Sequence, residues 1–260
     1  MTPSALDQVV IVAEYELRKY LRGRRLLGML ILLALIVGLI LGLPPALGIP
    51  YPSTPNAFVA ILANFTGILV LLCGVLFAAD ALVQEHEKRT GYFLFPNPIR
   101  RETIVVGKLL GSLAASALIL TLYYVAATVA AVAVTGAGSW EIGLSYAYAL
   151  AYMVCVVGVS FLISAILRTT ISATILTFFL FFLIFNIVQG VLLITDVDPW
   201  FLPTAAAGII GDVLAPAGPG PGPGFGYVPD VGVSLAVFAA YFLVGAVAAV
   251  FLYARRELVA

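Results

Sequence analysis

The chain has 260 residues, of which 63% are hydrophobic and 10% are charged, and its 13 basic residues balance 13 acidic ones. Soluble domains carry about 25% charged and about 45–50% apolar residues, so this composition excludes an ordinary soluble domain and requires a lipid solvent. The balanced charge favours no polyanionic partner such as nucleic acid. Cys73 and Cys155 fall inside apolar runs, which is more typical of small buried hydrophobic residues than of a disulfide.

The segment 4–25 is predicted to form an amphipathic helix in the plane of the lipid headgroups, with arginines off its apolar stripe. Ser4 and Asp7 fit a capping box, and Glu14 with Arg18 fits an i,i+4 ion pair. Packing on soluble structure is the alternative. The apolar stripe, which recurs at helical spacing, comprises Leu6, Val9, Val10, Ala13, Leu17, Tyr20 and Leu21.

Six apolar stretches are long enough to cross a bilayer, whose hydrocarbon core of about 30 Å needs roughly 20 helical residues. Within lipid, continuous helices satisfy their own backbone groups. We therefore expect an all-α integral membrane protein with six transmembrane helices. The first stretch lacks a convincing signal-peptide cleavage site and is interpreted as a retained span. The predicted spans are 26–43, 57–83, 104–134, 142–167, 171–194 and 231–254.

The positions of the basic residues predict the orientation. All Lys and Arg residues lie before span one, between spans two and three or just inside span three, between spans four and five, or after span six. The three alternate loops carry acidic but no basic residues. Because cytoplasmic loops are enriched in Lys and Arg, both termini are predicted to be cytoplasmic, with the protein in the cell (plasma) membrane.

The cytoplasmic loop 84–101 differs from a simple solvated turn. Its first part up to Arg89 favours helix, and Thr90-Gly91 is a natural stop. Phe93, Phe95 and two prolines then predict an apolar, non-helical return. A short charged helix followed by exposed aromatic residues favours docking to another protein, and a solvated turn is the alternative.

The outer loop 195–230 divides into two parts. Trp200 lies between two prolines, and the residues from 204 to 214 could form a short interfacial or re-entrant helix with Trp200 at headgroup depth. The segment 216–224 is almost entirely Pro and Gly, which is typical of a linker.

Few polar residues lie within the predicted spans. Asp80 is near the inner end of span two, while Asn64, Asn186 and Gln189 lie deeper and are expected to face a partner helix or a cavity. Span five also carries a cluster of aromatic residues, which suits either an amphipathic substrate or lipid. These residues are Phe178, Phe179, Phe181, Phe182 and Phe185. Two small-xxx-small pairs that permit close helix contact are Gly38 with Gly42 and Gly107 with Gly111.

Catalytic constellations are mostly missing from the sequence. Its single histidine, His86, falls in a loop, which argues against an intramembrane serine protease. Gly107-Lys108 lacks the upstream glycine and the following Ser or Thr of a Walker A sequence. We therefore expect no enzyme activity, cofactor or metal site in this chain, and ATP-driven work would need a partner.

Glu85, Glu87 and Thr90-Gly91 are followed by Phe95-Pro96, Ile99-Arg100-Arg101 and Gly107-Lys108. This run resembles the permease subunits of ABC-2 type transporters, whose pattern is a Glu-rich segment, Gly-Thr, a Leu-rich stretch, Pro, Arg, and a Gly-Lys that opens the third span. The order here is Thr-Gly, which departs from that pattern. The layout of an N-terminal amphipathic helix, six spans and a long loop before the last span is similar as well.

The resemblance implies a half-transporter that pairs with a second copy or a similar permease and binds a separate ATPase subunit, which would hold ATP and Mg²⁺. It implies that the N-terminal helix is an elbow helix and that spans two and five line the transport path. The coupling residues that it implies are Gln84, Glu85, His86, Glu87, Lys88, Arg89, Thr90 and Gly91. The path residues are Asn64, Phe178, Phe182, Phe185, Asn186 and Gln189.

Several functions fit the sequence. The leading hypothesis is export of a drug-like or lipid-like molecule or a polysaccharide, or a role in maturing an exported metalloenzyme as copper-site assembly permeases do. A membrane scaffold that recruits a cytoplasmic protein is the second. An ATP-independent channel or carrier is the third, although the inverted repeats expected of many carriers are not evident.

Overall fold

The computed structural model describes residues 4–84, 101–214 and 227–255. Helices and the loops between them make up this part of the chain, which contains no strand. Five of its helices are long and apolar enough to cross a membrane, and a bent pair makes a sixth. These spans are α2 (Arg24–Ala46), α3 with α4 (Pro55–Ala63 and Thr66–Cys73), α7 (Arg101–Thr135), α8 (Trp140–Ile166), α9 with α10 (Thr170–Phe179 and Phe185–Ile194) and α13 (Val231–Arg255). The predicted all-α membrane fold is thus confirmed.

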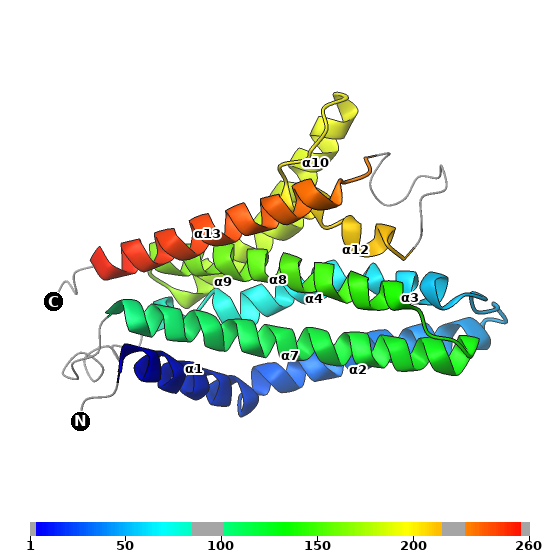
Figure 1. Cartoon of the computed structure of the whole chain (residues 1–260), viewed down its shortest axis with the longest axis horizontal. Coiled ribbons are helices and arrows are strands. Elements are labelled where there is room, and N and C mark those ends of the chain that lie inside the picture. The colour runs from blue at the N-terminus through cyan, green and yellow to red at the C-terminus, as the bar shows by residue number, and fades with distance from the viewer. Residues whose placement is uncertain (1–3, 85–100, 215–226, 256–260) are drawn as a thin grey trace.

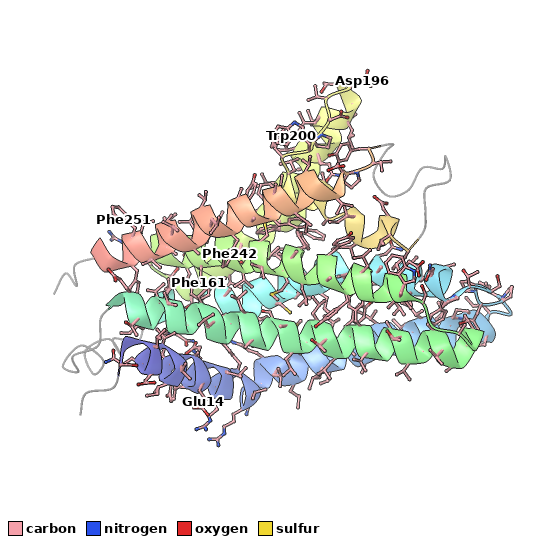
Figure 2. All side chains as sticks on the ribbon, in the orientation of Figure 1. Glu14, Phe161, Asp196, Trp200, Phe242 and Phe251 are labelled. Atoms are coloured by element: carbon pink, nitrogen blue, oxygen red, sulfur yellow. The ribbon has the colours of Figure 1, made fainter. Side chains whose placement is uncertain are left out.

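Helix α8 forms the centre of the bundle, between α7 on one side and α13 on the other (Figure 1). In its most apolar stretch 72% of the residues are buried, against 17% in α2 at the periphery. The α8–α13 contact depends on glycine: a Cβ on Gly245 would lie 2.5 Å from the Gly158 carbonyl oxygen. Phe242 of α13 packs over Gly158 and points toward α8 (Figure 2).

Span two is not the continuous helix that the sequence predicted. It bends by 42° between α3 and α4, and the five residues Gly74–Ala78 that follow α4 form a π-helix, η1. Tyr123 of α7 donates a hydrogen bond to the Leu62 carbonyl at the bend, with an O–O distance of 2.7 Å. The bend is therefore stabilised by a side chain from another helix.

A tyrosine also supplies a hydrogen bond that is missing at the end of α2, where the helix contains Pro44 and Pro45. Proline has no N–H to donate to the carbonyl four residues earlier, so Pro45 leaves the Leu41 carbonyl without its helical partner. The Tyr51 hydroxyl donates to that carbonyl instead.

Helix α1 (Ala5–Leu21) begins with the predicted capping box of Ser4 and Asp7, which is confirmed. It packs against the first part of α7 (Figure 1). A Cβ on Gly107 would lie 2.6 Å from the Cβ of Val12, and one on Gly111 would lie 2.8 Å from the Cβ of Glu16. The predicted close contact at this glycine pair is confirmed, and the neighbour is α1.

The predicted apolar stripe of α1 is divided between two environments. Tyr20 is buried, whereas Leu6 and Val10 remain 78% and 63% exposed. The predicted ion pair between Glu14 and Arg18 is present at 2.6 Å, and Glu14 lies on the face of α1 that points away from α7 (Figure 2).

Two four-residue helices, α11 (Pro203–Ala206) and α12 (Ile209–Asp212), lie in the loop between α10 and α13. They are packed against α13 and α8, and Ile209 and Ile210 are buried. Ser145 of α8 donates to the Ile210 carbonyl at 2.7 Å. This arrangement fits the predicted short helix, while the predicted linker 216–224 lies outside the described residues.

Candidate functional site

The described part of span two ends at Gln84, the first of the predicted coupling residues. The Gln84 amide donates to the Asp80 carbonyl at 3.0 Å. The remaining predicted coupling residues, Glu85, His86, Glu87, Lys88, Arg89, Thr90 and Gly91, lie outside the described residues. The structure therefore shows what holds the backbone immediately before the predicted coupling segment.

That backbone departs from α-helical geometry, and side chains satisfy its carbonyls. In a π-helix the bond runs from residue i+5 to residue i, as between the Ala79 amide and the Gly74 carbonyl at 2.9 Å. The Phe77 carbonyl accepts hydrogen bonds from Tyr20 of α1 at 2.6 Å and from Ser112 of α7 at 2.7 Å. Buried carbonyls without partners are costly, so these two hydroxyls stabilise the irregular segment.

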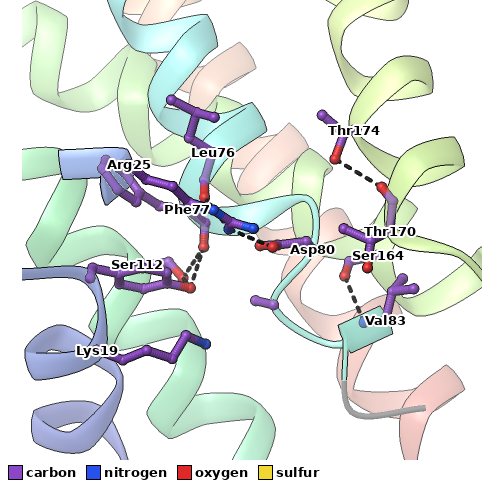
Figure 3. A network of polar contacts seen from close by, with 12 residues as sticks. Lys19, Arg25, Leu76, Phe77, Asp80, Val83, Ser112, Ser164, Thr170 and Thr174 are labelled. Carbon is purple, nitrogen blue, oxygen red and sulfur yellow. Dashed lines mark hydrogen bonds and ion pairs between the residues drawn. The ribbon is translucent and has the colours of Figure 1, made fainter. Parts of the chain in front are cut away.

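Arg25 at the start of α2 binds two groups of the same segment, one backbone carbonyl and one side-chain carboxylate (Figure 3). Its guanidinium donates to the Leu76 carbonyl at 2.9 Å and lies 2.5 Å from Oδ2 of Asp80. The Asp80 side chain is 4% exposed and that of Arg25 is 38% exposed. The cation therefore compensates a carboxylate that would otherwise be buried alone.

A second charged cluster joins α1 to α7. Lys108 donates to the Ala81 carbonyl at 2.8 Å, and its Nζ lies 3.8 Å from Oε2 of Glu16. Lys19 pairs with the other oxygen of Glu16. Burial raises the pKa of the Glu16 carboxyl, but the nearby Lys108 and Lys19 ammonium groups more than offset this effect and lower the pKa below its ordinary value.

Helix α8 contributes the last contact. The Ser164 hydroxyl accepts from the Leu82 amide at 3.0 Å and from the Val83 amide at 3.3 Å, as Figure 3 shows for Val83. We name as the inner collar the five side chains that bind the backbone of residues 76–83. These are Tyr20, Arg25, Lys108, Ser112 and Ser164. They come from α1, α2, α7 and α8, so four helices hold one segment.

The two asparagines among the predicted path residues lie at helix irregularities. Asn64 is exposed at the bend of span two, where its amide donates to the Ala60 carbonyl at 3.0 Å. Asn186 is also exposed, and its amide donates to the carbonyls of Phe181 and Phe182 at 2.9 and 3.0 Å. Both asparagines therefore bond the backbone of their own span.

The aromatic residues of span five gather around a second π-helix, η2 (Leu180–Ile184). Phe178 and Phe182 stack with their ring centres 5.0 Å apart, and Phe185 is half-buried against Tyr241 of α13. Gln189 is half-buried on α10. Helix α10 has no fully buried residue and leans away from the bundle (Figure 1). The π-helix η2 contacts α4, so spans two and five are neighbours.

Sequence reasoning did not find the inner collar. Tyr20, Ser112 and Ser164 look like ordinary helix residues, and their partners lie 57, 35 and 82 positions away along the chain. Lys108 was the one available signal, because a basic residue just inside an apolar span needs a partner. Within the described ranges, no three His, Cys, Asp or Glu side chains gather as a metal site would require.

Comparison with known families matches residues 10–199 to the family described as ABC-2 family transporter protein. The match covers most of the chain, from α1 to the start of the outer loop. The chain belongs to the ABC-2 transporter family. Comparison with curated proteins gives no match. Proteins of this family are membrane components of transporters. In this permease the matched region contains all five residues of the inner collar.

Proposed function

We propose that this permease is the membrane half of an ATP-driven exporter and that it binds a separate ATPase subunit through residues 84–91. Family membership supports the permease role. The observation that carries the coupling proposal is the inner collar, which fastens the backbone just before Gln84 to four helices. Force applied at the coupling segment would therefore move several spans together.

The physical basis is that packed helices respond as rigid bodies and switch between discrete arrangements. ATP binding would draw the two ATPase subunits together and displace the coupling segments of two paired permease chains. Because α8 lies at the centre of the bundle and Ser164 binds the amides of Leu82 and Val83, the displacement would reach α8 directly. ATP and Mg²⁺ would be bound by the ATPase subunit.

The proposed orientation places the inner collar at the cytoplasmic face of the cell membrane. Helix α1 and the end of α13 lie at the same end of the bundle (Figure 1). Arg168 lies between α8 and α9. Five more basic residues lie on α1 or at the α1–α2 junction, namely Arg18, Lys19, Arg22, Arg24 and Arg25. This distribution of basic residues supports cytoplasmic termini.

The proposed path runs between spans two and five of two paired chains. The exposed Asn64 and Asn186 would supply polar contacts, and Phe178, Phe182 and Phe185 would supply an apolar surface. Such a combination suits an amphipathic substrate.

Charge reversal in the coupling segment tests the proposal. Glu85→Lys and Glu87→Lys should insert into the membrane normally but lose capture of the ATPase subunit by the tagged permease in detergent. Glu14→Lys is the matched control, because Glu14 is an exposed acid on α1, and it should retain capture. Normal capture and coupled transport in both coupling variants would exclude docking at this segment.

The same experiment addresses the other functions. A scaffold would capture a cytoplasmic protein that does not hydrolyse ATP, and a carrier would transport substrate in vesicles that contain no ATPase. Either result would replace the exporter proposal.

A further inference from the structure

Five basic residues crowd the junction of α1 and α2, and the structure separates them into two groups. Three have acidic partners and therefore contribute to the fold. The three ion pairs are Arg18 with Glu14, Lys19 with Glu16, and Arg25 with Asp80. The remaining two residues are Arg22 and Arg24.

Arg22 and Arg24 flank Gly23, the residue at which α1 ends and α2 begins. Both side chains are exposed. Neither forms a side-chain hydrogen bond or an ion pair within the described ranges. The junction therefore carries two positive charges without an acidic partner within three residues of chain, and a bound anion would offset them.

The depth of the junction identifies the kind of anion. Helix α2 has 23 residues, or about 35 Å of helix, which slightly exceeds the hydrocarbon core of about 30 Å. Its apolar run starts at Leu26, two residues after Arg24. Arg22 and Arg24 therefore lie at the level of the lipid headgroups at one face of the membrane.

Apolar side chains flank the two arginines. Leu21 is 43% exposed and Leu27 is 61% exposed. Cationic groups beside exposed apolar anchors fit a surface that offers phosphate next to acyl chains. An acidic protein surface would match the charges but would leave the two leucines without an apolar partner.

We propose that Arg22 and Arg24 bind the phosphate of an anionic phospholipid in the cytoplasmic leaflet. Guanidinium groups suit this ligand because they donate two parallel hydrogen bonds to phosphate oxygens. Tyr20 and Arg25 of the inner collar lie on either side of the junction. The lipid therefore fixes the turn from which two collar side chains extend, and this role is independent of any ATPase.

Phosphatidylglycerol binding to the full-length protein tests the site. The lipid is titrated into purified protein held in mixed micelles of detergent and phosphatidylcholine, and retained phosphatidylglycerol is counted by native mass spectrometry. Arg22→Gln and Arg24→Gln should each weaken binding about fivefold, because a basic residue near an anionic surface contributes about 1 kcal/mol. Raising the salt concentration should reduce this difference through screening.

Arg168→Gln is the matched control. Arg168 is exposed between α8 and α9 and has no ion pair within the described ranges, so its loss removes the same charge elsewhere. Binding should be unchanged in this variant. Equal melting temperatures of all variants in phosphatidylcholine alone would show that each is folded.

Four results would overturn the proposal. Equal weakening in all three variants would show diffuse attraction to surface charge, and unchanged binding in all three would show that the arginines do not bind lipid. Glycerol phosphate that competes as well as the intact lipid would indicate a site for free phosphate. If Arg22→Gln and Arg24→Gln abolished ATPase capture with lipid binding intact, the two arginines would contact protein.

Discussion

Replacing Arg25 by Gln should destabilise the protein more than replacing its partner Asp80 by Asn. Oδ2 of Asp80 is buried without a hydrogen-bond partner apart from the Arg25 guanidinium, within the described ranges. Loss of Arg25 therefore leaves a buried carboxylate uncompensated, which costs about 3 kcal/mol or more. Loss of the carboxylate leaves a 38% exposed arginine that still donates to the Leu76 carbonyl, so we expect about 1 kcal/mol.

The assay is thermal unfolding in one detergent at neutral pH. At about 2–4 °C per kcal/mol for a chain of this size, Arg25→Gln should lower the melting temperature by about 6–12 °C and Asp80→Asn by about 2–4 °C. The double variant should be more stable than Arg25→Gln alone, because it no longer buries a lone charge. Equal losses in the two single variants, or simple additivity in the double variant, would refute this account of the ion pair.

Three further predictions concern helix packing, backbone satisfaction and pH. Gly245→Leu should prevent α8 and α13 from packing, since even a Cβ would lie 2.5 Å from the Gly158 oxygen. Size-exclusion chromatography of the variant should show aggregate, and a normal monodisperse peak would contradict the expected clash. Tyr51→Phe should cost about 1–3 kcal/mol in denaturant unfolding, because the Leu41 carbonyl loses its donor, and an unchanged midpoint would count against that bond. The pKa of Glu16 is lowered from its ordinary value of 4.5, so its contribution to stability is present above that pH and is lost as the pH falls below it. Melting temperatures measured down to pH 4 should therefore fall more in the wild type than in Glu16→Gln, and equal falls would exclude a stabilised carboxylate.

The membrane spans could be predicted because their signal is local. A run of about 20 apolar residues is visible without any knowledge of its neighbours, and the Gly107 and Gly111 pair correctly indicated a close helix contact. The second pair, Gly38 with Gly42, shows no such contact: in the described part of the chain, no atom of another element lies within 4 Å of a Cβ built on either glycine.

The irregular features of the spans could not be predicted, because distant side chains stabilise them. The bend in span two depends on Tyr123, which lies 61 positions from the carbonyl that it bonds. The unwound end of the same span depends on Ser164, which lies 81 positions from Val83. A sequence pattern read one segment at a time predicts a straight helix in both places.

The candidate site was predicted in one part and missed in another. The charged and aromatic pattern after Gln84 indicated a docking segment, which remains a prediction because residues 85–91 lie outside the described ranges. The inner collar was missed because hydroxyl and basic groups near the ends of spans have many ordinary explanations, and only their positions in space show that they meet.

Site-specific photo-crosslinking from Gln84 tests the central claim most directly. A photoreactive residue at this position, in permease expressed with its native membrane partners, should form a covalent adduct with a nucleotide-hydrolysing subunit. The control position is Trp140, which is 73% exposed and is the first residue of α8. Helix α8 begins at the end of the bundle opposite to the chain termini (Figure 1), so this position should give no such adduct. An ATPase adduct from Gln84 alone is the expected result, whereas its absence, or an equal yield from Trp140, would contradict coupling at the inner face.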